Sequence, residues 1–279
     1  MRSDGRARLL AITRPFGKGE ETTDYVRQLG WNSLIVHSVQ LIHRDPSDLF
    51  SDLREIISEG LIDWMVFMSP EGVHRIFEVL RTHGNLLPSL LGKFRVVAVG
   101  PTTRDAVMKQ GLREVEMPIE FSSRGIAKLL AGYSLDQKRV VLVRSADADS
   151  FLDRALASNG ARVVTIPVYS SSQPRDITSV TLLIEHLQNR RVDAILFTSS
   201  RSVSNLFSIV EKTIGPGKLV DFLSSCIVGA IGPVTAQTLR DFNIQVDVLP
   251  EHSLVNEAAK SLTETWESKH SPELIRSAQ

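Results

Sequence analysis

The sequence predicts an α/β protein made of two similar domains, each a doubly wound parallel sheet, and three observations support this. Short runs of β-branched residues alternate with amphipathic segments along most of the 279 residues. The alternation occurs twice, with an offset close to 130 residues. Proline follows serine or glycine after several of the runs, a position typical of the first residue of a helix. Strand–helix alternation implies parallel strands joined by right-handed crossovers.

The first strand and helix of each repeat are the easiest to align. The segment LLAITR (9–14) matches RVVLVR (139–144), and the arginines that end them, Arg14 and Arg144, are 130 positions apart. Each segment is followed by a helical stretch that closes at a glycine, Gly30 or Gly160, again 130 positions apart. A glycine just past a helix is a common end signal.

Two further pairs of segments follow in the same order. DWMVFMSPEGV (63–73) matches DAILFTSSRSV (193–203), and VVAVGPTTRDAV (96–107) matches IVGAIGPVTAQT (227–238). Asp63 and Asp193 are 130 positions apart, and Gly100 and Gly232 are 132 apart. Matches at nearly one offset indicate a duplicated domain.

The order of the repeats leaves two domain assignments open. In a tandem assignment the domains are 1–130 and 131–279. In a swapped assignment 1–37 pairs with 171–279, and an inserted domain occupies the residues between. The segments 37–45 and 166–174 sit at equivalent points of the repeats and could be two strands that join the domains. Periodicity does not choose between these assignments.

Composition limits the class of protein. Lys+Arg and Asp+Glu both total 32, so the chain lacks the basic excess of a nucleic-acid-binding protein. No segment approaches the ~20 apolar residues that a membrane span needs, and the charged N-terminus does not resemble a signal peptide. The single cysteine, Cys226, excludes an internal disulfide and fits a reducing compartment. We therefore expect a cytoplasmic protein that binds neither nucleic acid nor membrane.

Common catalytic motifs are missing from the sequence. The seven histidines show no HExxH or closely paired spacing, which with one cysteine argues against a zinc site. The phosphate-binding GxxxxGK[ST], the dinucleotide-binding GxGxxG and the nucleophile elbow GxSxG do not occur. We expect chemistry without a metal, a nucleotide or a nucleophilic serine.

Polar residues follow the predicted strands, where doubly wound sheets bind ligands. Free N–H groups at a helix start attract anions, but one helix end contributes only about 0.3–1 kcal/mol. Several such ends would together hold a ligand with many carboxylates. Ser69 and Ser199 have an alternative role as helix caps, and the arginines could be surface ion-pair partners. The candidate binding residues are Arg14, Ser69, Thr102, Thr103, Arg144, Ser199, Ser200, Gly232 and Thr235.

Taken in series, six motifs resemble those of the uroporphyrinogen-III synthase family. They are LLAITRP (9–15), FMSPEGV (67–73), VAVGPTT (97–103), PVY (167–169), FTSSRSV (197–203) and AIGPVTA (230–236). Their order and spacing match from about residue 8 to 264. The resemblance implies the swapped arrangement, with 1–37 plus 171–279 as one domain, 42–167 as the other, and a two-stranded linker at 38–41 and 168–170.

The resemblance also implies an activity. A family member would be a lyase of tetrapyrrole (porphyrin or haem) biosynthesis that acts without a cofactor. It would cyclise hydroxymethylbilane, a linear tetrapyrrole with eight carboxylates, to uroporphyrinogen III, with inversion of ring D and loss of water. Helix N-termini and Ser/Thr hydroxyls from both domains would hold the carboxylates. Tyr169 matches the linker-adjacent tyrosine of the family, which implies that it helps the hydroxyl leave as a hydrogen-bond donor.

One loop departs from the family pattern, which puts its binding role in doubt. The family often has GPTTA where this chain has Val234 within GPVTA (232–236), and valine cannot donate a hydrogen bond through its side chain. A non-catalytic, ligand-sensing relative of the synthases is therefore an alternative function. A two-lobed binding protein like the periplasmic receptors is another, although no secretion signal supports it. No heptad or clear apolar stripe indicates a partner, so we expect a monomer.

Overall fold

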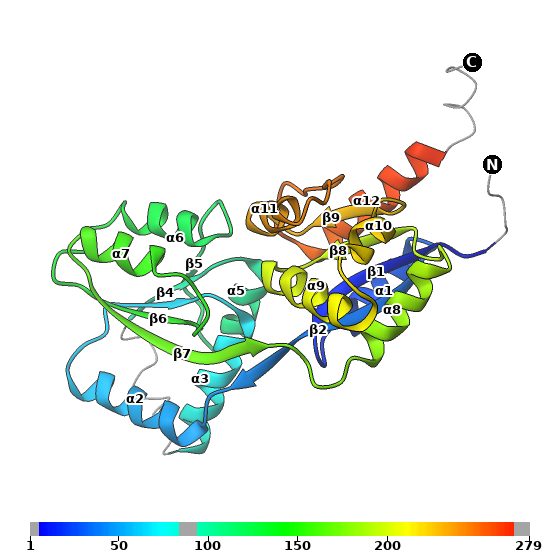
Figure 1. The fold of residues 1–279 in the computed structure, drawn as a ribbon. Coiled ribbons are helices and arrows are strands. Elements are labelled where there is room, and N and C mark those ends of the chain that lie inside the picture. The colour runs from blue at the N-terminus through cyan, green and yellow to red at the C-terminus, as the bar shows by residue number, and fades with distance from the viewer. Residues whose placement is uncertain (1–5, 84–93, 271–279) are drawn as a thin grey trace. The chain divides into compact units, whose positions relative to one another are not determined.

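The computed structural model describes residues 6–83 and 94–270, and the chain divides into two compact units (Figure 1). Unit 1 is Met1–Leu41 with Ser172–Gln279, and unit 2 is Ile42–Ser171. Within the described part of the chain, no helix is long and apolar enough to cross a membrane.

Unit 1 carries four strands and six helices in its described residues. They are β1 (Leu9–Pro15), α1 (Glu20–Gln28), β2 (Asn32–His43), α8 (Thr178–Gln188), β8 (Ala194–Phe197), α9 (Ser200–Ile214), α10 (Lys218–Leu223), β9 (Ile227–Ala230), α11 (Pro233–Asp241) and α12 (Val255–His270). The last two residues of β2 belong to unit 2.

Unit 2 carries five strands and five helices in its described residues. They are α2 (Pro46–Ser58), β3 (Trp64–Phe67), α3 (Pro70–Thr82), β4 (Arg95–Ala98), α5 (Pro101–Met108), β5 (Val115–Glu116), α6 (Ser123–Leu130), β6 (Arg139–Ser145), α7 (Phe151–Ser158) and β7 (Arg162–Ser172). The final residue of β7 belongs to unit 1.

The strands of each unit are parallel and follow the same order. Unit 1 has the order β2-β1-β8-β9, and unit 2 has β7-β6-β3-β4-β5. Numbered within each repeat, this is the 2-1-3-4 order of a doubly wound sheet, with a fifth strand in unit 2. The predicted α/β class with parallel sheets is confirmed.

The register shows which strands of the repeats pair. Ala11 of β1 lies opposite Ile195 of β8, and Met65 of β3 lies opposite Val141 of β6. The first strand of each sheet thus pairs with a third strand that belongs to the other copy of the sequence repeat, as the swapped order requires. The predicted domain bounds themselves stay a prediction.

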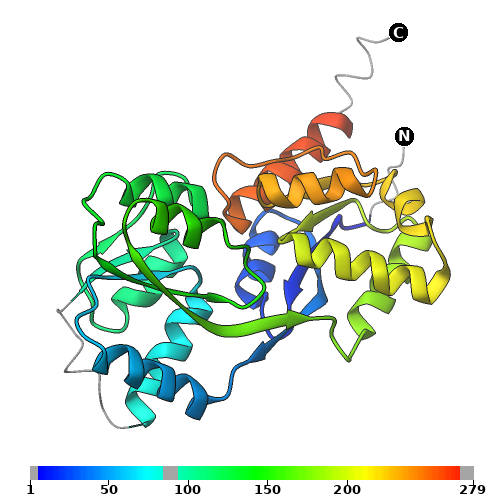
Figure 2. The ribbon, with the colours of Figure 1, turned by 60° about the vertical axis from the view of Figure 1, so that its left-hand side comes forward.

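Helices cover both faces of each sheet, because alternate strand residues face opposite sides. In unit 2, Val141 and Val143 pack with apolar residues of α2, α3 and α5, while Val140 and Leu142 pack with those of α6 and α7. Figures 1 and 2 show these two groups of helices on opposite sides of the unit 2 strands. In unit 1, α8 to α11 cover one face, and α1 and α12 cover the other.

The repeat is also visible in the details of the backbone. Asp63 accepts a hydrogen bond from the N–H of Arg139 at the start of β6, and Asp193 accepts one from Leu9 at the start of β1, both at 2.9 Å. The register of both first strands shifts at the same place, after Arg14 in β1 and after Arg144 in β6. The matched aspartates therefore fix the amino ends of equivalent strands.

Candidate functional site

The carboxyl end of β3 brings Ser69 and Tyr169 together in unit 2. Ser69 is the N-cap of α3, and its hydroxyl oxygen accepts the backbone N–H of Gly72 at 3.1 Å. The Tyr169 hydroxyl, on β7, donates to the same oxygen at 3.2 Å. Ser69 thus has the capping role that serines favour. Because its oxygen accepts both bonds, the Ser69 proton is available to donate to a ligand.

The surroundings of Tyr169 keep its phenol protonated. The side chain is half-buried against the apolar cluster of α2, α3 and α5. Burial raises the pKa of Tyr169 above its ordinary value of 10.0, and the negative charges of Glu71 and Asp147 act in the same direction. The Ser69 hydroxyl can donate to the ionised phenol, which lowers the pKa of Tyr169 and opposes this shift only in part. At neutral pH Tyr169 is therefore a hydrogen-bond donor and a weak acid.

The helix that follows β4 begins without a side-chain cap. Gly100 is the N-cap of α5 in extended backbone (φ −170°, ψ 178°), and Pro101 occupies the first helical position. The first intrahelical bond runs from Arg104 N–H to the Gly100 carbonyl at 2.9 Å. The N–H groups of Thr102 and Thr103 precede that bond, so they have no carbonyl partner inside the helix. This end of unit 2 can accept an anion.

The corresponding helix of unit 1 has the same start. Gly232 is the N-cap of α11 in extended backbone (φ −168°, ψ 174°), without a side-chain cap. A Cβ at this position would lie 2.8 Å from the Ser253 hydroxyl oxygen, so a larger residue would require the Ser253 side chain to move. The backbone N–H groups of Val234 and Thr235 lie in the uncapped first turn. The Val234 side chain is 75% exposed, so this loop offers backbone donors where the family has a threonine.

At the other predicted helix start in unit 1, side chains of the helix itself accept the hydrogen bonds of the first turn. Ser199 caps α9 in a reciprocal capping box with Ser202. The buried Thr13 hydroxyl donates to the Ser202 hydroxyl oxygen at 3.0 Å. Ser200 is the first residue of α9 and is partly exposed. Ser199 therefore has the structural role of a cap, like Ser69, but without a tyrosine partner among the described residues.

The two arginines of the repeat differ in their surroundings. Arg144 is buried, pairs with Asp153 at 2.8 Å and donates to the carbonyl of Asp149. Within the described residues, Arg14 forms no hydrogen bond or ion pair through its guanidinium, and its Nε is buried without a partner. Burial lowers the pKa of Arg14, while the charge of Glu21 raises it. Arg144 holds the loop before α7 through these contacts, and the anion-binding roles of both arginines stay predictions.

Three charged residues near Tyr169 were not among the sequence candidates. His43 pairs with Glu71 at 2.7 Å. Asp147 accepts the backbone N–H and the hydroxyl of Ser171, both at 2.6 Å, beside a bond from Ala146 N–H to the Tyr169 carbonyl at 2.8 Å. No motif marks His43 or Asp147, and Glu71 was not singled out within FMSPEGV (67–73), because the partners of all three are distant in sequence. In the described ranges, no group of three or more His, Cys, Asp or Glu side chains could hold a metal ion.

A cavity of about 950 Å³ lies at the opposite edge of unit 2, where the strands start. Its charged lining residues pair among themselves: Arg95 with Glu116 at 2.6 Å, and Lys138 with Asp63 at 2.9 Å. The carboxyl edge, with its uncapped helix and protonated tyrosine, is the better candidate, since ligands of doubly wound sheets bind there.

Known proteins match this chain over most of its length. The family model described as uroporphyrinogen-III synthase HemD matches residues 20–259. The chain belongs to the uroporphyrinogen-III synthase family. A protein of Methanothermobacter thermautotrophicus, named provisionally as such a synthase, is 28% identical over 91% of this chain and 96% of its own length. The uroporphyrinogen-III synthase of Synechococcus elongatus is 24% identical over 82% of this chain and 85% of its own.

Solved uroporphyrinogen III synthases share the fold. A mutant of the Thermus thermophilus enzyme matches with a TM-score of 0.66 and 21% identity, covering 95% of this chain and 100% of that chain. The Helicobacter pylori enzyme matches with a TM-score of 0.58 and 15% identity, covering 92% and 99%. The family thus connects this chain to lyases that act on a small tetrapyrrole.

Proposed function

We propose that this chain cyclises hydroxymethylbilane to uroporphyrinogen III, with inversion of ring D and loss of one water. Family membership supports the reaction class, and the Tyr169–Ser69 hydrogen bond beside Glu71 is the observation that carries the mechanism. It supplies a neutral phenol donor at the carboxyl edge of a parallel sheet, where a ligand is expected.

In this proposal Tyr169 assists the first step. The C–O bond of the hydroxymethyl group breaks, and the hydroxyl takes up a proton with help from the phenol hydrogen bond and leaves as water. The resulting azafulvene cation is attacked by the substituted carbon of ring D. The spiro intermediate then rearranges to the inverted ring and loses one proton, which balances the proton taken up by the leaving hydroxyl. The net change is a dehydration, which requires no oxidant, reductant or other cofactor.

Carboxylate binding is assigned to each unit by itself, at the carboxyl edge of its own sheet. The uncapped first turns of α5 and α11, with Thr102, Thr103 and Thr235, would hold substrate carboxylates through backbone N–H groups. Arg14 would add a charged donor, and each charge-assisted hydrogen bond contributes roughly 1.5–3 kcal/mol. The Ser69 proton is free for the same purpose. Ser199, Ser200 and Gly232 stay proposed binding residues; Gly232 is the N-cap of α11, and Ser199 and Ser200 start α9.

Positioning is sufficient for the selectivity that the reaction needs. A hundredfold preference for isomer III over isomer I corresponds to only about 2.8 kcal/mol between two transition states. Orienting ring D against the cation can supply that difference without a strong nucleophile. This explains how a site of hydroxyls, backbone donors and one tyrosine would be adequate.

The decisive experiment is an assay with freshly generated hydroxymethylbilane. Products are oxidised and the type I and type III isomers are separated by chromatography. We expect isomer III to predominate in proportion to protein concentration. Isomer I alone, at the rate of the protein-free reaction, would reject the proposal and favour a ligand-sensing relative. We further propose that the protein is a cytoplasmic monomer; sedimentation of the purified chain tests its oligomeric state.

A further inference from the structure

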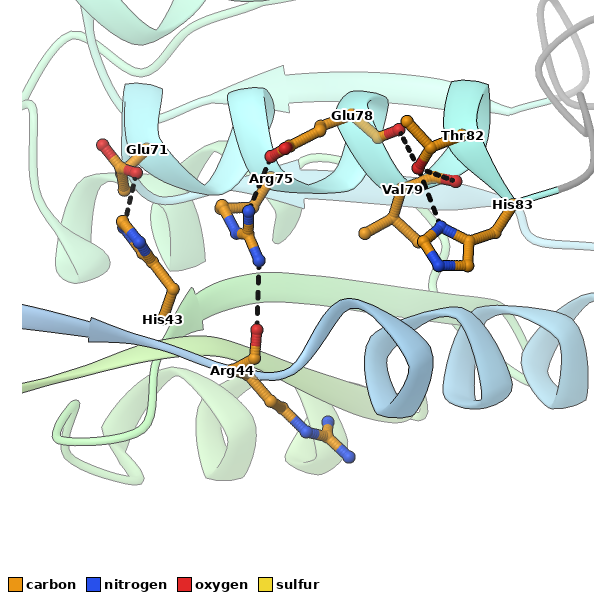
Figure 3. A network of polar contacts seen from close by, with 8 residues as sticks. All are labelled: His43, Arg44, Glu71, Arg75, Glu78, Val79, Thr82 and His83. Carbon is orange, nitrogen blue, oxygen red and sulfur yellow. Dashed lines mark hydrogen bonds and ion pairs between the residues drawn. The ribbon is translucent and has the colours of Figure 1, made fainter.

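The end of β2 connects the two elements that carry Ser69 and Tyr169. The backbone N–H of Arg44 donates to the carbonyl of Val168, the residue before Tyr169, at 3.1 Å. The guanidinium of Arg75, on α3, donates to the carbonyl of Arg44 at 3.1 Å. Figure 3 shows this second bond reaching from α3 to the chain just after β2. The segment 43–44 is thus bound to β7 on one side and to α3 on the other.

His43 adds a contact to α3 that depends on protonation. Its Nε2 lies 2.7 Å from Oε1 of Glu71, in the first turn of the helix (Figure 3). The Glu71 side chain is 15% exposed and that of His43 is 41% exposed. Glu71 lies two positions after Ser69, which accepts the hydroxyl of Tyr169. The contact is an ion pair only when the imidazole is protonated, and histidines change charge between about pH 5 and 8.

We propose that His43 and Glu71 are positioning residues for Tyr169, and that protonation of His43 tightens their hold on the Tyr169–Ser69 pair. The inference rests on the proposed function, because it concerns the same site. With His43 charged, the end of β2 is fixed to α3 at two points, through Glu71 and through Arg75. The bond from Arg44 to Val168 carries that constraint to the strand of Tyr169. With His43 neutral, the ion pair is reduced to a weaker hydrogen bond.

The other charged groups of this cluster belong to classes that titrate elsewhere. Arg44 pairs with Asp52 on α2, and Arg75 pairs with Glu78 on α3 at 2.6 Å. Asp147, in the loop after β6, contributes its negative charge at Tyr169. Carboxylates and guanidinium groups ordinarily change charge outside the range of histidine. A step in activity that is lost in His43→Gln and kept in the control variant is therefore assigned to His43.

The first test compares kcat across about pH 5 to 9 for the wild type, His43→Gln, Glu71→Gln and the control His83→Gln. His83 follows the last turn of the same helix and contacts the Thr82 hydroxyl at 2.7 Å (Figure 3). We expect kcat of the wild type and the control to fall in one step as the pH rises. Both His43→Gln and Glu71→Gln should lose the step and lower kcat about tenfold at low pH, with KM nearly unchanged.

A second readout needs no turnover. The phenol of Tyr169 is titrated by ultraviolet absorbance, as the difference between each protein and the same protein with Tyr169→Phe. Glu71→Gln should lower the pKa of Tyr169, because one of the charges that raises it is removed. Thermal unfolding of each variant verifies that it folds.

The outcomes separate the inference from the proposed function. A pH step that persists in His43→Gln, or an unchanged Tyr169 titration in Glu71→Gln, overturns the positioning role even if isomer III is formed. If the wild type forms no isomer III, the proposed function fails. The absorbance titration then still decides whether Glu71 acts on Tyr169: a lowered pKa supports the contact, and an unchanged one overturns it.

Discussion

Replacing Tyr169 with phenylalanine removes a single hydroxyl from the proposed site. The ring can keep its packing against the cluster of α2, α3 and α5, and Ser69 keeps its cap on Gly72. One hydrogen bond, from the phenol to the Ser69 oxygen at 3.2 Å, is lost. The structural cost is therefore that of a half-buried hydrogen bond, about 0.5–1.5 kcal/mol.

The expected loss of activity is much larger than the loss of stability. Removing one donor that stabilises developing charge in a transition state costs about 2.7–4 kcal/mol, or 10²–10³ in kcat. A protein destabilised by about 1 kcal/mol is still almost entirely folded at 25 °C, since domains are stable by ~5–15 kcal/mol. Unfolding cannot account for a drop of that size.

The assay follows initial rates of isomer III formation for Tyr169→Phe, with Tyr133→Phe as the matched control. The Tyr133 hydroxyl donates to Glu116 at 2.6 Å, and its ring packs against Trp64, at the start of β3. The control should keep the wild-type kcat. A Tyr169→Phe protein with kcat within about threefold of wild type would refute the donor role, because a loss that small is below the range for a charge-stabilising group.

Three further predictions concern other parts of the chain. Arg144→Gln should destabilise the fold by on the order of 3 kcal/mol, because it breaks a buried ion pair. Arg14→Gln should leave the unfolding midpoint nearly unchanged and raise KM about tenfold. Equal effects of the two variants on unfolding in urea would contradict this prediction. Gly125→Ala should lower the free energy of unfolding by about 1–3 kcal/mol, because the new Cβ would lie 1.9 Å from the carbonyl oxygen of residue 120. The control is Gly132→Ala, whose Cβ would have its nearest contact at 3.3 Å. Equal melting temperatures of the two variants would rule out the clash. Burial raises the pKa of Cys226 from 9.0 to about 12, so alkylation at pH 8 should be at least about 100-fold slower in the native protein than in urea. Because the folded pKa is the higher one, the thiol stabilises the fold below about pH 9 and loses that contribution as the pH rises to 12; rapid native-state labelling would contradict the burial.

Much of the fold could be predicted because the backbone conformation of strands and helix ends depends mainly on residues close together in sequence. The strands at 9–15 and 139–145 are runs of β-branched and apolar residues that favour extended backbone. Pro70, Pro101 and Pro233 occupy first helical positions as predicted, because a missing N–H costs nothing there. Gly30 and Gly160 adopt positive φ after their helices (79° and 87°), which glycine does without strain.

The site was predicted less completely, because side-chain partners are chosen by tertiary packing. Arg14 and Arg144 look equivalent in sequence, yet only Arg144 finds a carboxylate on the next helix. Ser69 and Ser199 both cap helices, yet only Ser69 also receives a tyrosine hydroxyl, in the described residues. His43 and Glu71 are 28 positions apart, and no motif contains both of them.

The sequence by itself determined the duplication, the parallel α/β class, the family and the positions of the helix starts for which we predict anion binding. These follow from propensities and spacings that act over a few residues or repeat at a fixed offset. Only the tertiary structure decided that β1 pairs with β8 and β3 with β6, and which of the repeated polar groups are satisfied internally. Pairing and burial depend on which segments meet in space, and the local patterns of two similar repeats do not distinguish between the two connections.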